Sequence, residues 1–199
     1  MSKIAIEGNA SGTGTFTIAS PNSNSSRTLS LPDGTGTFVV NGINSSIVSG
    51  TSVASTSGTS IDFTGIPSWV RRITVMFNGV STNGTSFNQI QIGSGSFTTS
   101  GYASQFWTAS TSSGLITTGF GIFSLLGAGN SFSGSVVLTN ITGNIWVCNG
   151  NLIYANVGST GWSSAGNSPE LGGTLDRVRI TTVNGTDTFD AGSINILYE

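Results

Sequence analysis

The sequence predicts an all-β protein in which a short intertwined β-shaft precedes a jelly-roll-like antiparallel β-sandwich. Short runs of alternating apolar and polar residues recur along the chain, and this is the period of a half-buried strand. Turn signals such as Asn83-Gly84 and Asn184-Gly185 separate these runs. No segment has a convincing helical period. The closest approach, residues 68–76, carries β-branched residues at alternate positions and therefore favours a strand.

The expected shaft begins with a repeat. The pentapeptide Gly-Thr-Gly-Thr-Phe occurs at residues 12–16 and again at 34–38, and each copy begins an alternating run. A repeated unit of strand and turn is typical of stacked β-structure, in which neighbouring units bury each other's apolar faces. With a period of two, six apolar side chains share one face and are the predicted shaft core: Phe16, Ile18, Leu29, Leu31, Phe38 and Val40.

Six apolar side chains form a thin core, so the shaft segment is expected to need partners in order to fold. Three chains wound around one axis would bury all six positions and pair every exposed strand edge. The sequence therefore favours a homotrimer.

The chain is expected to fall into three parts. Residues 1–42 are the predicted attachment and shaft segment, and residues 43–58, rich in small polar residues, are a predicted linker or extended strand. Residues 59–199 are the predicted sandwich, whose first clear strand is 71–77. The further expected strands are 88–92, 105–109, 117–126, 134–141, 144–149, 152–157, 175–183 and 193–198.

Parts of the sequence resemble a known group of proteins. The run 14–22, continuing through 27–33 to 36–39, resembles the shaft segment of many bacteriophage fibre and receptor-binding proteins. The stretches 66–81 and 191–199 resemble the first and last strands of the sandwich tip domain of phage and prophage fibres. The resemblance implies a homotrimeric structural protein of the virion. Its N-terminal region would attach to another virion protein, and its tip would recognise the host surface.

Composition argues against several other classes of function. Only 7% of residues are charged and the net charge is −2, which removes the basic surface that nucleic-acid binding requires. With no histidine, Ser-His-Asp and Cys-His catalysis are impossible and a zinc site would lack its commonest ligand. The Gly-Thr-Gly-Thr repeats lack the lysine and the following helix of a phosphate loop. We therefore expect no enzymatic activity and no cofactor. No metal site is assigned, and a calcium site built from acidic side chains and backbone carbonyls stays open, although the chain has no Asp-x-Asp-x-Asp-Gly loop.

The chain also lacks signals for secretion or membrane insertion. Its start has no apolar signal-peptide core, and no window approaches eighteen uninterrupted apolar residues. Folding in a bacterial host cytoplasm, followed by display on the surface of the virion, fits both observations.

Aromatic residues are the candidate receptor- or glycan-binding residues. Trp162 lies in the run 158–167, a predicted loop without another large apolar residue, where an exposed ring would stack on a sugar face. Tyr102 and Trp107 are candidates for a second patch, with core packing or a trimer interface as the alternative. Trp69 and Trp146 lie beside or within expected strands and are predicted to be structural.

Other reactive side chains have structural interpretations. The pairs Arg71/Arg72 and Arg177/Arg179 lie in alternating patterns and are expected on a solvated face or in ion pairs between chains. Cys148, the single cysteine, is expected to be a buried structural thiol.

Three alternatives to a host-recognising fibre stay open. A capsid head fibre or decoration protein would need a similar attachment end, whereas a carbohydrate-binding module would not need the shaft. A glycan-degrading enzyme would use paired carboxylates, for which Asp187 and Asp190 are the candidates. Aspartates that stabilise turns are the competing explanation for these two positions.

Overall fold

The computed structural model describes residues 11–13, 22, 24–26, 47–107, 114–123, 127–154 and 161–199. The chain divides into two compact units, Met1–Phe38 and Val39–Glu199. The predicted shaft core lies outside the described residues, so the shaft and its trimer stay predictions: Phe16, Ile18, Leu29, Leu31, Phe38 and Val40.

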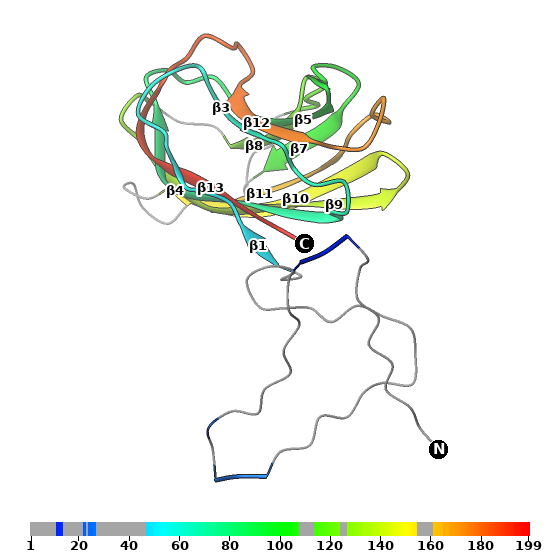
Figure 1. Cartoon of the computed structure of the whole chain (residues 1–199). Coiled ribbons are helices and arrows are strands. Elements are labelled where there is room, and N and C mark those ends of the chain that lie inside the picture. The colour runs from blue at the N-terminus through cyan, green and yellow to red at the C-terminus, as the bar shows by residue number, and fades with distance from the viewer. Residues whose placement is uncertain are drawn as a thin grey trace. The chain divides into compact units, whose positions relative to one another are not determined.

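The described part of the second unit consists of two antiparallel sheets that face each other (Figure 1). Sheet A has the order β1-β13-β4-β9-β10-β11-β7, and β2 also pairs with β13. Its strands are β1 (Val48–Ser49), β2 (Val53–Ala54), β4 (Arg72–Thr82), β7 (Ala103–Trp107), β9 (Phe132–Thr142), β10 (Ile145–Tyr154), β11 (Gly161–Asn167) and β13 (Phe189–Tyr198).

Sheet B has the order β3-β12-β5-β6, and β8 also pairs with β5. Its strands are β3 (Ser60–Thr64), β5 (Asn88–Ser94), β6 (Ser96–Phe97), β8 (Phe120–Phe123) and β12 (Arg177–Thr182). The described residues contain no helix, and every strand pair among them is antiparallel. The prediction of an all-β antiparallel sandwich is confirmed. Among these residues there is accordingly no helix of the length and apolarity needed to cross a bilayer.

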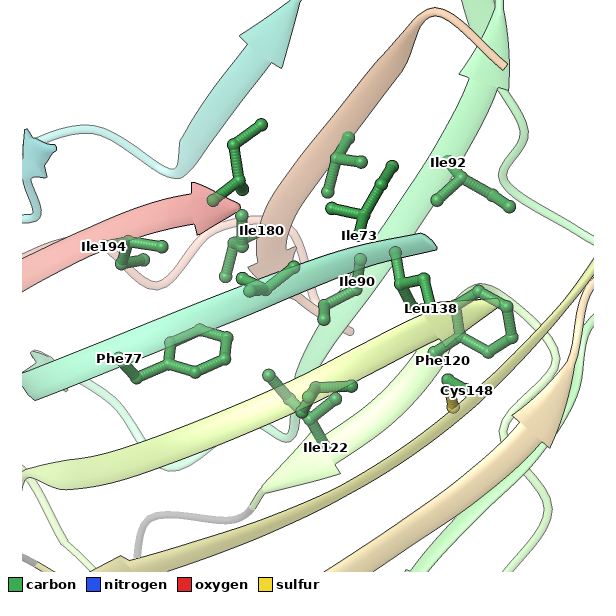
Figure 2. Packing of buried hydrophobic residues seen from close by; sticks show 14 of the residues in the cluster. Ile73, Phe77, Ile90, Ile92, Phe120, Ile122, Leu138, Cys148, Ile180 and Ile194 are labelled. Atoms are coloured by element: carbon green, nitrogen blue, oxygen red, sulfur yellow. The ribbon is translucent and has the colours of Figure 1, made fainter. Parts of the chain in front are cut away.

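The core lies between the inner faces of the two sheets. Alternation along β4 buries Ile73, Val75 and Phe77, as the sequence predicts. Figure 2 shows the layer in which Ile73 and Phe77 of sheet A meet side chains of sheet B such as Ile90. Cys148 on β10 belongs to the same layer, and its burial raises the pKa of the thiol to about 12. The prediction of a buried cysteine is confirmed.

Aromatic rings fill one region of this core. Phe123 on β8 stacks on Phe132 of β9 at 4.7 Å between ring centroids. The same ring makes edge contacts with Tyr154 at 4.9 Å and with Trp162 at 5.4 Å. Since these four residues come from four strands in both sheets, the cluster ties the two layers together.

Two of the expected strands are one strand in the structure. The sequence predicts separate strands over 144–149 and 152–157, and the residues around the break are Asn149, Gly150 and Asn151. The structure instead has the single strand β10, because this segment pairs with residues 135–137 of β9 and with 163–165 of β11. Hydrogen-bonding partners on both sides override the local turn preference.

The expected linker contributes two short strands to sheet A. Within residues 43–58, β1 and β2 both pair with β13. Ser55 is buried, its backbone N–H donates to the carbonyl oxygen of Gly192 at 3.0 Å, and its hydroxyl donates to that of Ala191 at 2.8 Å. This segment therefore forms the edge of sheet A next to β13.

Candidate functional site

A polar pocket of about 300 Å³ lies on the outer face of sheet B. We call it the sheet B pocket. Strands β3, β5 and β12 form its floor, and the segments around residues 99, 118 and 185 form its walls. Its lining residues are Thr59, Ser60, Gln89, Gln91, Thr99, Thr118, Arg179, Thr181, Thr182, Val183 and Gly185.

The strand period explains why these side chains share one face. On β5, Ile90 and Ile92 are buried in the core, so Gln89 and Gln91 point to the other side of the sheet. On β12, Val178 and Ile180 point inward in the same way, and Arg179 and Thr181 point outward. The register of the strands sets these residues beside one another, with Arg179 opposite Gln91 and Thr181 opposite Gln89.

A chain of hydrogen bonds fixes the two glutamine side chains. The Gln91 Nε2 group donates to the Thr118 carbonyl oxygen at 2.9 Å, and the Thr118 hydroxyl donates to Gln89 Oε1 at 2.7 Å. Gln89 Nε2 donates to the carbonyl oxygen of Thr182 at 3.3 Å. Both glutamines are buried, with 2% of Gln89 and 6% of Gln91 exposed. Their amides are therefore held in one orientation at the pocket floor.

The side-chain oxygen of Gln91 has no hydrogen-bonding partner among the described residues. Gln91 lines the pocket, and its Oε1 is not among the fully buried polar atoms, so solvent reaches it. Water can satisfy this oxygen in the empty pocket, and an N–H or O–H group of a bound molecule can take the place of that water.

The charge of Arg179 is balanced inside the same chain. Arg179 Nε and one terminal nitrogen donate to the two carboxylate oxygens of Asp62 at 2.8 and 2.7 Å. This hydrogen-bonded pair raises the pKa of Arg179 above its ordinary value. The ring of Phe97 packs on the guanidinium group, with its centroid 4.0 Å from the central carbon. Arg179 therefore lies on a solvated face, one of the two predicted alternatives, and its ion pair with Asp62 is within the chain.

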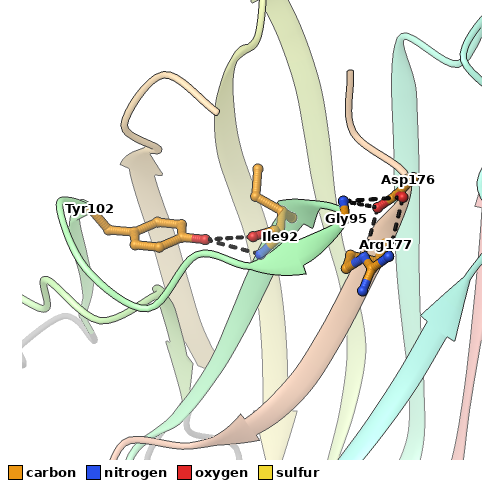
Figure 3. A network of polar contacts seen from close by, with 5 residues as sticks. All are labelled: Ile92, Gly95, Tyr102, Asp176 and Arg177. Atoms are coloured by element: carbon orange, nitrogen blue, oxygen red, sulfur yellow. Dashed lines mark hydrogen bonds and ion pairs between the residues drawn. The ribbon is translucent and has the colours of Figure 1, made fainter. Parts of the chain in front are cut away.

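The hairpin that carries Phe97 is fastened from two sides (Figure 3). On one side, the Tyr102 hydroxyl accepts from the backbone N–H of Ile92 at 2.9 Å and lies 3.1 Å from the carbonyl oxygen of Thr98, a second partner. On the other side, the Asp176 carboxylate accepts from the Gly95 N–H at 3.2 Å. The same carboxylate binds the guanidinium group of Arg177, which lowers the pKa of Asp176.

Tyr102 therefore positions the wall of the pocket, and its replacement gives a measurable effect. We expect Tyr102→Phe to lower the free energy of unfolding by about 1–3 kcal/mol, because the buried Ile92 N–H loses its partner. Burial raises the pKa of Tyr102 to about 12, so the hydroxyl keeps its proton at neutral pH. Urea denaturation of both proteins measures the difference.

Tyr198→Phe is the matched control. The Tyr198 side chain is only half-buried, and its hydroxyl makes no hydrogen bond with the described residues. Its replacement is expected to change the free energy of unfolding by less than about 0.5 kcal/mol. Equal effects of the two substitutions would contradict the role assigned to the Tyr102 hydroxyl.

The structure corrects the prediction made for Trp162. The segment 161–167 is strand β11 rather than a loop, because it pairs with β10 on one side and with β7 on the other. Trp162 points into the core, where 8% of it is exposed and its ring lies 5.2 Å from that of Phe106. The prediction of an exposed sugar-stacking ring is wrong at this position.

The two other predicted aromatics are separated. Tyr102 is 2% exposed and packs edge-on against Phe120, with 5.0 Å between the ring centroids. It is therefore a core residue, which is one of the alternatives given for it above. Trp107 is 41% exposed and lies on the outer face of sheet A. It sits opposite Ser163, whose hydroxyl donates to Asn151 Oδ1 at 2.8 Å. The predicted aromatic residues therefore form no common patch, and Trp107 stays a separate candidate.

The acidic residues considered for catalysis occupy a turn and a strand. Asp187 Oδ1 accepts from Asn184 Nδ2 at 2.6 Å, and its Oδ2 accepts from the N–H of Ser86 at 3.0 Å. Asp190 is exposed on β13, and neither aspartate lines the sheet B pocket. In the described part of the chain, no three His, Cys, Asp or Glu residues come together as a metal site would require. Asp187 thus has the turn-stabilising contacts that the competing explanation expects.

Sequence reasoning missed the residues of the sheet B pocket. The signal was present, since Gln89 and Gln91 alternate with isoleucines in one expected strand, and Arg179 and Thr181 alternate with apolar residues in another. What was missing was the information that these two strands are neighbours.

Compared with protein-family models, with curated proteins and with solved structures, the chain matches none. The candidate site therefore depends on the geometry of the described residues.

Proposed function

We propose that this protein is a structural virion protein, a homotrimeric phage fibre whose sandwich recognises the host surface. The observation that carries the proposal is the sheet B pocket, which is lined by hydroxyl and amide groups, with the single charge of Arg179 balanced by Asp62. Such a lining suits a neutral polar molecule of a cell surface. The shaft-like repeat at residues 12–16 and 34–38 supports the fibre assignment.

A trimeric fibre could bind a surface tightly even if each pocket has a low affinity for its ligand. Neutral hydrogen bonds exchange with water and give little net affinity each. Three identical tips on one fibre, and several fibres on one particle, would multiply this affinity by avidity without any new contact. The thin shaft core and the pocket thus support the same function.

Measuring the mass of the full-length protein in solution tests the trimer. A species of three times the chain mass of 20.2 kDa is expected, and its trimeric state should depend on residues 1–42. A stable 20.2 kDa species at working concentration would refute the fibre. If that monomer bound sugar, and kept doing so without residues 1–42, it would instead be a carbohydrate-binding module.

Labelling the protein on intact virions tests its location. We expect the label on tail structures that contact the host. Label on the faces or vertices of the capsid would identify a head fibre or decoration protein instead.

Incubation with host-surface polysaccharide tests the enzymatic alternative. We expect no release of oligosaccharide. Release that is lost in Asp187→Asn or Asp190→Asn would contradict the proposal of a non-enzymatic fibre.

A further inference from the structure

We propose that the sheet B pocket is a binding site for a neutral saccharide unit, with Gln91 and Arg179 as its central hydrogen-bonding residues. This inference rests on the proposed function, because it names the ligand through which the sandwich would recognise a surface. It assigns the ligand to sheet B rather than to the aromatic residues of sheet A.

The pairing of β5 with β12 places an acceptor and a donor side by side. Gln91 and Arg179 are directly opposite each other, a position in which side chains of neighbouring strands are about 4.5–5.5 Å apart at Cβ. Gln91 offers the unpartnered Oε1, and Arg179 keeps N–H groups that Asp62 does not use, since a guanidinium has five. Adjacent hydroxyl groups of a sugar can donate to the first and accept from the second.

The remaining lining fits a ligand with many hydroxyl groups. The Thr118 hydroxyl gives its proton to Gln89, and the Thr181 hydroxyl gives its proton to the Thr59 carbonyl oxygen at 2.8 Å. Both oxygens keep lone pairs for a further donor. A molecule with several O–H groups can donate hydrogen bonds to these oxygens. A hydrocarbon would displace their water without offering a hydrogen bond in its place.

Charge and size narrow the ligand class. Asp62 already neutralises Arg179, and the described lining holds no second cation for an anionic ligand. The volume of about 300 Å³ is at the lower end of the range of about 300–1,000 Å³ for small-molecule sites. Among the described lining residues, Val183 is the single aliphatic side chain. These features favour one or two neutral sugar rings over an acidic sugar or a lipid.

Titration of the full-length protein with defined sugars tests the inference. The neutral probes are glucose, galactose and N-acetylglucosamine, and the anionic probes are glucuronic acid and N-acetylneuraminic acid, each followed by saturation-transfer NMR. We expect at least one neutral sugar to bind, with a dissociation constant of about 1 mM for a ligand of this size. The two anionic sugars are expected to bind at least tenfold more weakly.

Two substitutions in the pocket and one outside it locate the binding. Gln91→Leu removes the acceptor, and Ser60→Tyr fills the pocket from β3 at a side chain that makes no hydrogen bond with the described residues. Each is expected to weaken binding about tenfold or more. Trp107→Ala, on the outer face of sheet A, should leave the dissociation constant unchanged. If circular dichroism shows that Gln91→Leu does not fold, the affinity of Ser60→Tyr alone decides whether the sugar binds in the sheet B pocket.

Several results would overturn the inference. These are the absence of binding by every neutral sugar, preferred binding of the anionic sugars, and binding that Trp107→Ala abolishes while Ser60→Tyr preserves it. The fibre proposal fails separately. A monomer that binds neutral sugar in this pocket would refute the fibre proposal and support the saccharide site. A virion-bound trimer that binds no neutral sugar would support the fibre proposal and refute the saccharide site.

Discussion

Replacing Phe123 by alanine is expected to lower the free energy of unfolding by about 3–5 kcal/mol. The ring is fully buried and contacts Phe132, Tyr154 and Trp162, so its removal leaves a cavity at the point where the two sheets meet. Rigid neighbouring rings cannot collapse into this space, and the contacts made by Phe123 are lost without replacement. The midpoint and slope of urea denaturation give the change.

An exposed residue provides the control for Phe123. Leu115 is 66% exposed, and Leu115→Ala is expected to change the free energy of unfolding by no more than about 0.5 kcal/mol. Phe123→Leu, which fills part of the cavity, should fall between the two. If Phe123→Ala cost no more than Leu115→Ala, the aromatic cluster would not be the connection between the sheets that we describe.

Gly192→Ala is expected to cost about 2–5 kcal/mol, the second large effect. Gly192 has a φ of 90°, in the region that side chains disfavour, and lies at an irregularity in the pairing of β13 with β4. A Cβ atom there would lie 2.4 Å from the carbonyl oxygen of Gly79 and 2.6 Å from that of Asn78. Because both contacts are to backbone, β13 would have to move away from β4.

Gly79→Ala separates backbone strain from this close approach. Gly79 has a φ of 62°, but a Cβ atom there would meet nothing within 4 Å. Its replacement is expected to cost about 1–2 kcal/mol from the φ angle alone. Thermal and urea denaturation of the two variants give the difference due to the clash, and equal costs would show that the strands are not this close at Gly192.

The sequence predicted the strands best where apolar residues alternate strongly. All but the first residue of the expected strand 71–77 belongs to β4, and 88–92 is most of β5. The alternation of β11 is weak, because Trp162 and Ser164 point inward between glycines and polar residues, and such a pattern predicts a loop. Strands such as β11 form because both neighbours offer backbone partners, and that information is absent from the local sequence.

The candidate site was harder to predict than the fold. A single tryptophan among small residues predicts an exposed ring at position 162. In the structure this ring is buried and packs against the rings of Phe106 and Phe123. The pocket residues carry no motif, since glutamine, threonine and serine occur throughout this chain. Their significance depends on Gln91 and Arg179 being cross-strand neighbours.

By itself, the sequence determined the all-β class, the inward faces of the strongly alternating strands and the burial of Cys148. These follow from a period of two and from the free energy of burying apolar surface, which act over a few neighbouring residues. Only the tertiary structure decided the order of the strands, the burial of Trp162 and Tyr102, and the position of the sheet B pocket. The physical reason is that strand pairing joins residues far apart in the chain, so a site built across strands exists only once their register is set.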